Sequence, residues 1–198
     1  MASSEQIIAT FLQRVGGGHA DDVRALLLAV PALVNAVGPH PHWGGRPQAL
    51  HVAVETGRRD IFDILLGHGA DPSGKNDQYD WWSPLMIAIH RHHDAMRDEL
   101  IRRGARIGVT EALLLANDEM SEALLARGLP ETVPNGGSLL AFARTTAAID
   151  FLIAIGAEID MADRWGTTPI QAFSRLGAVG QPLVAHLIAL GVPAPPPD

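Results

Sequence analysis

Pairs of bulky aliphatic residues recur along the chain, each followed by two variable residues and a glycine. The five copies are LLGHG from Leu65, LIRRG from Leu100, LLARG from Leu124, LIAIG from Leu152 and LIALG from Leu187. A helix that ends at a glycine with positive φ accounts for this pattern, because glycine has no Cβ to clash in that conformation. A sixth, imperfect copy begins at Leu27 and has Pro31 in place of the glycine. The pattern predicts a series of repeated helices.

A second phrase marks the start of another helix in three of these repeats. Its copies are QALHVAV from Gln48, SPLMIAI from Ser83 and TPIQAFS from Thr168. Serine or threonine before proline predicts a helix N-cap followed by proline at the first helical position, where the missing N–H has no cost. Each repeat is therefore expected to contain a helix, a turn, a second helix and a terminal glycine.

These two phrases together resemble the ankyrin repeat family, whose pattern is G-x-T-P-L-H-x-A, a turn, and L-L-x-x-G-A-D. The match is close from Arg46 to Asp71, good from Trp82 to Ala105 and good around RWGTTPIQAFSRLG, but poor between Val109 and Gly128. The resemblance implies an all-α solenoid of stacked antiparallel helix pairs with finger loops between them. It also implies recognition of partner proteins.

The resemblance predicts a single ankyrin-repeat domain over residues 1–198. Its expected parts are an N-terminal capping repeat at 1–35, repeats at 36–70, 71–105, 106–129, 130–157 and 158–192, and a frayed tail at 193–198.

The spacing of the terminal glycines predicts that two repeats have lost part of a loop. Gly69 and Gly104 are 35 residues apart, whereas Gly104 and Gly128 are 24 apart and Gly128 and Gly156 are 28 apart. The fourth and fifth repeats are therefore expected to be short. A notch beside the shortened fourth repeat, next to the long loop at residues 71–82, is a possible pocket.

The tryptophans and the single tyrosine are all predicted to lie in loops. They are Trp43, Tyr79, Trp81, Trp82 and Trp165. Such side chains provide large contact areas and are enriched at interaction hot spots, although each ring could instead fold back against a neighbouring loop. Asp77 and Asp80 could hold a cation beside the rings, or they could be solvated turn residues.

Histidines supply the remaining candidate chemistry. His51 occupies the histidine of the T-P-L-H motif, so the resemblance implies a structural role in holding adjacent loops together. His90 falls at a position that faces the concave groove of ankyrin solenoids. A set of His40, His42, Asp77 and His90 could bind zinc or provide a base with an orienting carboxylate, although the spacing matches no metal signature.

Composition and charge narrow the class of protein. The 198 residues have a formal net charge of −7, and the 15 Lys and Arg are scattered, so no nucleic-acid partner is expected. The absence of cysteine excludes disulfides and thiolate metal sites. The longest apolar run, Ala25 to Val34, is far shorter than a membrane helix. Since no signal peptide is recognised, we expect a cytoplasmic protein with no membrane partner. The many Ala, Gly, Arg and Leu residues and the few Lys residues indicate a bacterial origin.

Two functional hypotheses stay open. The first is a binding module that recognises a partner protein through the finger loops and the concave face, using Trp43, Tyr79, Asp80, Trp81, Trp82, His90 and Trp165. The second is a small-molecule or catalytic pocket in the notch, with His90 and Asp77 or Asp80 as acid/base or cation-binding groups. The second is favoured by the irregular repeats, by the gathering of aromatics and histidines, and by the chain being taken as a whole small protein. No catalytic motif and no cofactor is recognised, so enzymatic activity is left open.

Overall fold

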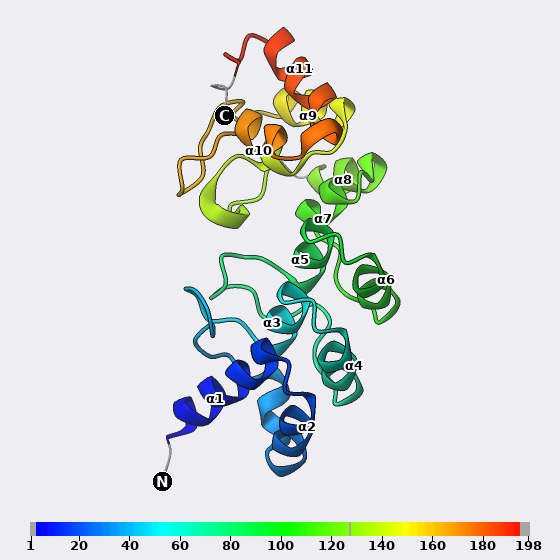
Figure 1. Cartoon of the computed structure of the whole chain (residues 1–198). Helices are drawn as coiled ribbons and strands as arrows, with labels where there is room; N and C mark the ends of the chain where they lie inside the picture. Colours follow the sequence, from blue (N-terminus) through cyan, green and yellow to red (C-terminus); the bar gives the residue numbers. More distant parts are fainter. Residues whose placement is uncertain (1–2, 127, 195–198) are drawn as a thin grey trace. The chain divides into compact units, whose positions relative to one another are not determined.

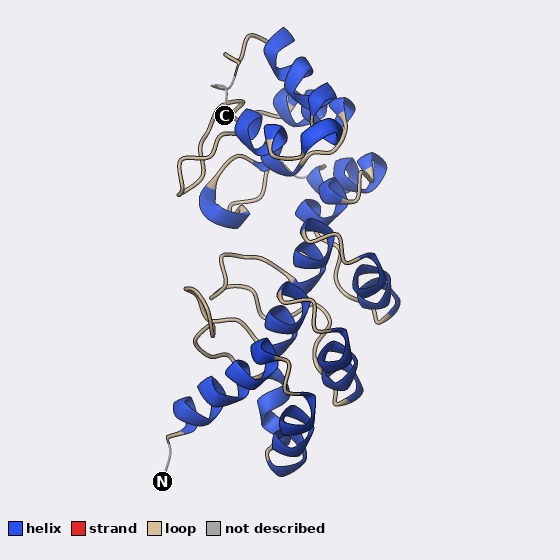
Figure 2. Cartoon of the chain, viewed as in Figure 1, coloured by secondary structure: helices blue, strands red, loops and turns tan. Residues whose placement is uncertain are grey.

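The computed structural model describes residues 3–126 and 128–194 and divides the chain into two compact units. Unit 1 ends at Arg106 and unit 2 begins at Ile107 (Figure 1). Within the described ranges the regular elements are helices, accompanied by an isolated antiparallel bridge between Val37 and Gln48 (Figure 2). The predicted all-α fold is confirmed. The predicted single domain over 1–198 remains a prediction, and residues 195–198 of the expected tail lie outside the described residues.

Unit 1 is built from pairs of antiparallel helices. Its elements are α1 (Ser4–Gly17), α2 (Ala20–Ala29), the 3-10 helix η1 (Pro31–Asn35), α3 (Ala49–Glu55), α4 (Arg59–Gly67), α5 (Pro84–His90) and α6 (Asp94–Arg102). Helices α1, α3 and α5 follow one another in a row, with α2, α4 and α6 on one side and two long loops on the other (Figure 1). We call these loops the first finger, residues 36–48, and the second finger, residues 68–83.

The core of unit 1 lies between the helix pairs, and the first leucine of each recurring aliphatic pair is buried there, with Leu27, Leu65 and Leu100 at most 1% exposed. Phe11, Leu50, Phe62 and Leu85 are at most 1% exposed. No helix in the described ranges is both long and apolar enough to cross a membrane.

The glycines that were predicted to end the helices have the expected backbone conformation. Their φ angles are 86° at Gly69, 82° at Gly104, 103° at Gly128, 97° at Gly156 and 94° at Gly191. A residue with a Cβ is strained at such angles, so glycine is the residue that lets each helix stop and the chain reverse.

Helix α5 begins as the sequence predicts, and its cap can be tested. The Ser83 Oγ accepts a hydrogen bond from the backbone N–H of Met86 at 3.1 Å, and Pro84 is the first helical residue. We expect Ser83→Ala to lower the free energy of unfolding by about 1 kcal/mol, because a helix N–H loses its acceptor. Urea denaturation would measure this loss. Ser83→Thr keeps the hydroxyl and should lose less, and equal losses in both variants would contradict the capping role.

Unit 2 has shorter and less regular repeats. Its elements are α7 (Val109–Leu114), α8 (Asp118–Leu125), the 3-10 helices η2 (Pro134–Gly136) and η3 (Leu139–Phe142), α9 (Thr146–Ala154), α10 (Pro169–Ser174), the 3-10 helix η4 (Gly177–Val179) and α11 (Gln181–Ala189). The short η3 packs against α7, α9 and α10, and α11 packs against α9 and α10.

One repeat of unit 2 departs from the expected pair of α-helices. The 3-10 helix η3 stands where the first helix of the repeat at residues 130–157 was predicted. Ser138 caps η3, and Thr145 already caps α9 by accepting a hydrogen bond from the N–H of Ala148 at 3.0 Å. The six residues between the two caps, 139–144, are too few for a multi-turn helix and a turn.

Candidate functional site

The two fingers of unit 1 are joined by hydrogen bonds near their bases and along their length. The backbone N–H of Arg46 donates to the carbonyl oxygen of Gln78 at 2.9 Å. The N–H of Lys75 donates to the side-chain oxygen of Gln48 at 2.6 Å, and the Gln48 amide donates to the carbonyl of Asn35 at 2.7 Å. These contacts tie the second finger to the first and to the end of η1.

His51 has the structural role that the resemblance implied. Its Nδ1 accepts the N–H of Gln48 at 3.3 Å, so the proton is on Nε2, which donates to Asn76 Oδ1 in the second finger at 2.8 Å. The side chain is fully buried, and this burial lowers the pKa of His51 to about 4 despite the hydrogen bond to Asn76. A neutral histidine therefore links α3 to the second finger.

Glu55, at the end of α3, is the centre of the contacts between the fingers. Its Oε2 accepts hydrogen bonds from Tyr79 Oη at 2.6 Å, His40 Nε2 at 3.1 Å and Trp43 Nε1 at 3.4 Å. Its Oε1 accepts one from Arg91 at 3.3 Å. Burial alone would raise the pKa of Glu55, but the hydrogen bonds from His40 and Tyr79 outweigh it and lower the pKa to about 2. Glu55 is thus a carboxylate held by both fingers.

His40 is enclosed by the same cluster. Its Nδ1 accepts the backbone N–H groups of His42 at 3.0 Å and Trp43 at 3.1 Å, so its Nε2 carries the proton that is donated to Glu55. The ring is stacked on Trp43 with centroids 4.9 Å apart and on Tyr79 at 5.8 Å. Its side chain is fully buried. Both ring nitrogens therefore have structural roles.

The possible zinc set of His40, His42, Asp77 and His90 gains no support from this geometry. Within the ranges that the structure describes, no group of three or more His, Cys, Asp or Glu side chains could hold a metal ion. The reason is visible at His40, because its ring is turned into the Glu55 cluster. The notch that was expected beside the fourth repeat would need residues of both units and remains a prediction.

The other predicted binding residues differ in exposure. Trp43 is 53% exposed and Trp81 is 47% exposed, whereas Tyr79, Asp80 and Trp82 are half-buried. Trp82 contacts the ring of the exposed His90 edge to face, with centroids 5.4 Å apart. Asp77 is exposed in the second finger. Trp165, which is 71% exposed, belongs to unit 2 and is a separate feature.

A turn near the C-terminal end of the second finger has a strained backbone. The N–H of Trp82 donates to the carbonyl of Tyr79 at 2.9 Å, and the two central residues have positive φ, 52° at Asp80 and 65° at Trp81. Two positive φ angles define a type I′ turn, in which Asn and Gly are the usual residues. A tryptophan in this conformation is unfavourable, so this half-exposed ring is presented at the expense of stability.

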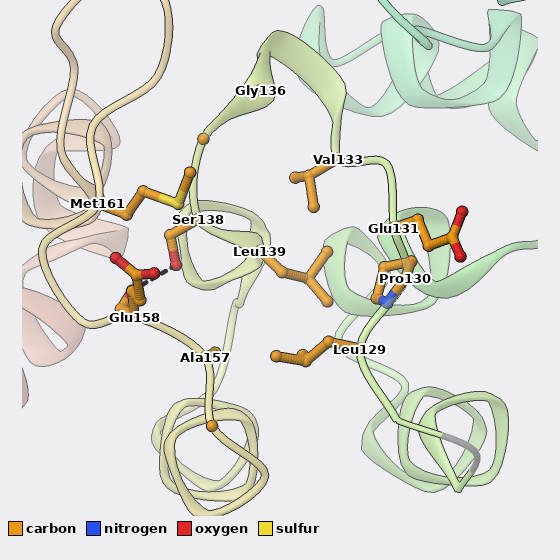
Figure 3. Close-up of a pocket in the computed structure, with 12 residues that line it drawn as sticks. Leu129, Pro130, Glu131, Val133, Gly136, Ser138, Leu139, Ala157, Glu158 and Met161 are labelled. Carbon is orange, nitrogen blue, oxygen red and sulfur yellow. Dashed lines mark hydrogen bonds between the residues drawn. The ribbon is translucent and has the colours of Figure 1, made fainter.

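A pocket of about 240 Å³ lies within unit 2, between residues 129–139 and 156–161 (Figure 3). Its apolar side chains include Leu129, Val133, Leu139 and Met161. None of the candidate binding, catalytic or metal-ligating residues named from the sequence lines it. The loop around η2 has no hydrophobic periodicity, so this pocket could not be predicted from the sequence pattern.

Glu55 was also missed as a site residue. A signal was available in the sequence, because Glu55 stands five residues after Leu50, just as His90 stands five residues after Leu85 in the next repeat. A carboxylate at a position expected to face the groove is a candidate for contacts with the fingers.

Comparison with known proteins supports the repeat pattern. A family model for ankyrin repeats, in three copies, matches residues 13–111, which is half of the chain. A search of curated proteins found no match. Ankyrin repeats are generally protein–protein interaction modules. The helix pairs, the glycine-terminated helices and the matched residues lead to one conclusion: the chain belongs to the ankyrin repeat family.

Proposed function

We propose that the protein is a binding module that recognises a partner protein through the two fingers of unit 1. The observation that carries this proposal is the exposure of two tryptophans, Trp43 and Trp81, on fingers that are held together by Glu55. Tryptophan offers a large contact area with a polar N–H and is enriched at interaction hot spots.

The contacts beneath the tryptophans reduce the entropic cost of binding. Trp43 donates to Glu55 and stacks on His40, so its ring is held before any partner arrives. Trp81 is held by its turn and by a hydrogen bond from its own N–H to the carbonyl of Asn76 at 3.0 Å. A preorganised surface loses less conformational freedom on association, and more of its contact energy becomes affinity.

The residues around the two tryptophans extend the proposed surface. Tyr79, Asp80 and Trp82 are neighbours of Trp81 along the second finger, and His90 at the end of α5 contacts the ring of Trp82. Polar rims around aromatic anchors are typical of protein interfaces. A role for Trp165 in binding, the use of the concave face, the absence of nucleic-acid and membrane partners, and a cytoplasmic location remain predictions.

The strained turn provides a clean test of this function. In Trp81→Gly the ring is removed, but glycine accepts the positive φ, so we expect the free energy of unfolding to change by less than about 1 kcal/mol. Combined with Trp43→Ala, the change should abolish retention of the partner. The measurement is quantitative mass spectrometry of proteins captured from a lysate of the source organism by immobilised wild-type and variant chains.

Leu28→Ala is the matched control, because Leu28 is a large apolar residue of unit 1 that is 71% exposed but lies on α2, away from the fingers. It should capture the same protein as the wild type. If the double variant is folded and still retains every protein that the wild type retains, the fingers are not the binding surface.

The small-molecule or catalytic alternative, with His90 and Asp77 or Asp80 as acid/base or cation-binding groups, remains a prediction. Two observations weigh against it. His40 and Tyr79 are already hydrogen-bonded to Glu55, and the pocket of unit 2 is not lined by His90, Asp77 or Asp80.

A further inference from the structure

The negative charge of the chain is concentrated in unit 2. Residues 1–106 contain 12 Asp and Glu against 11 Lys and Arg, whereas residues 107–198 contain 10 Asp and Glu against 4 Lys and Arg. Unit 2 therefore carries a formal charge of −6 out of the total of −7. Such an imbalance favours association with positively charged partners.

The pocket of unit 2 is partly open to solvent, and its lining is more apolar than polar. Figure 3 shows Val133, Leu139 and Met161 around its centre, with Leu129 at one side. Leu129 is 39% exposed and Met161 is 41% exposed, although both are large apolar side chains. A concave apolar surface of this kind is a place where a partner can bury a side chain.

The walls of this pocket are held by hydrogen bonds and close packing. Ser138 Oγ donates to the carbonyl of Glu158 at 2.7 Å, which joins its two sides, and the N–H of Arg164 donates to the carbonyl of Asn135 at 3.1 Å. A Cβ on Gly137 would lie 3.0 Å from the Cα of Asp163, so the two loops approach too closely for any other residue. The pocket is therefore formed before a ligand binds.

The size of the pocket decides what class of ligand fits. Sites for whole small molecules are usually about 300–1,000 Å³. At about 240 Å³ this pocket is smaller than that range and matches a single large side chain. Interface anchors are side chains of this kind.

Acidic residues lie at the edge of the pocket. Glu131 and Glu158 are among its lining residues and are exposed, as is Asp160 beside Met161. Figure 3 shows the carboxylate of Glu131 turned away from the centre of the pocket, which places this charge at the rim. The guanidinium of Arg164 lies over the ring of Trp165, 6.0 Å from its centroid.

We propose that this pocket binds a basic segment of a partner protein, with one large apolar side chain in the pocket and flanking Lys or Arg residues beside Glu131 and Glu158. The apolar side chains of the lining account for the anchor, and the acidic residues at the rim account for the basic flanks. This site belongs to unit 2 alone, so it does not depend on the fingers of unit 1.

The experiment uses capped nonapeptides of the form Gly-Gly-Lys-Lys-X-Lys-Lys-Gly-Gly, in which X is Leu, Met, Phe, Trp or Gly, and the same series with Glu in place of Lys. The full chain is labelled at its methionine methyl groups and followed by NMR, with the Met161 signal assigned from Met161→Leu. We expect a Lys-flanked peptide with an apolar X to shift the Met161 signal saturably, with a Kd below about 1 mM. Met86 and Met96, buried in unit 1, should not shift.

The peptide series and a charge control decide the outcome. Replacing X with Gly, or Lys with Glu, should weaken binding at least about tenfold, as should Glu131→Lys with Glu158→Lys. The matched control, Glu119→Lys with Glu122→Lys on α8, changes the net charge equally and should alter binding less than about twofold. The proposal is overturned if no peptide shifts Met161 at millimolar concentration, if the Glu series binds equally well, or if both charge reversals act alike.

Discussion

Glu55→Ala is expected to lower the free energy of unfolding of unit 1 by about 3 kcal/mol at neutral pH. The change removes the acceptor for two groups that cannot readily turn to water, the fully buried His40 Nε2–H and the half-buried Tyr79 hydroxyl. A buried donor without an acceptor costs roughly 1–3 kcal/mol. Glu55→Gln keeps one acceptor oxygen and is expected to lose about half as much.

The measurement is urea denaturation in a Trp165→Phe background, so that the three remaining tryptophans, all in unit 1, provide the fluorescence signal. Asp63→Ala is the control, because Asp63 is an exposed carboxylate that pairs with Arg59 on α4 at 3.0 Å. Surface pairs of this type contribute less than about 1 kcal/mol. A loss for Glu55→Ala no larger than that for Asp63→Ala would mean that the finger cluster does not stabilise unit 1.

The pH dependence of Glu55 adds a second readout to this prediction. Its pKa is about 2 in the folded chain, compared with an ordinary value of 4.5. The folded state therefore favours the ionised carboxylate, and the resulting stabilisation of about 3 kcal/mol is complete above pH 4.5 and is lost as the pH falls toward 2. Glu55→Gln should lack this loss, since the amide does not titrate in that range.

The repeat pattern was predictable from the sequence because its signals are local. A glycine such as Gly69 or Gly104 ends a helix through its own backbone conformation, and Ser83 with Pro84 starts one within a single turn. Neither needs information from elsewhere in the chain. The loss of a loop before α7 was likewise visible as a short distance between glycines.

The contacts of Glu55 were not predictable in the same way. Its partners His40 and Tyr79 are 15 and 24 residues away, in loops without hydrophobic periodicity. Their hydrogen bonds depend on how two fingers pack, and no residue spacing specifies that packing. The turn at Trp81 could not be predicted either, because neither of its two positive-φ positions is a glycine or an asparagine.

Lowering the pH from 6.5 to 4 is expected to destabilise unit 1 through His51. The pKa of His51 falls from 6.5 to about 4 because the ring is buried, so the folded state stays neutral while the unfolded chain takes up a proton. Stability therefore rises with pH in this window and falls on acidification by up to about 1.4 kcal/mol per pH unit, about 3 kcal/mol in total. Below about pH 4 the folded state is protonated too, and this loss stops. This pH window, from 4 to 6.5, lies above most of the range between about 2 and 4.5 in which protonation of Glu55 lowers the stability.

His51→Gln should remove that pH dependence, because glutamine does not titrate. The variant is expected to be less stable at pH 7 by about 2 kcal/mol, since the hydrogen bonds to Gln48 and Asn76 are lost or weakened. Urea denaturation at several pH values in the Trp165→Phe background measures both effects. His186→Gln is the control, because His186 pairs with Asp150 in unit 2 and should leave the slope for unit 1 unchanged. If His51→Gln keeps the slope of the parent between pH 6.5 and 4, the buried histidine is not its source, and the proton must be taken up elsewhere in unit 1.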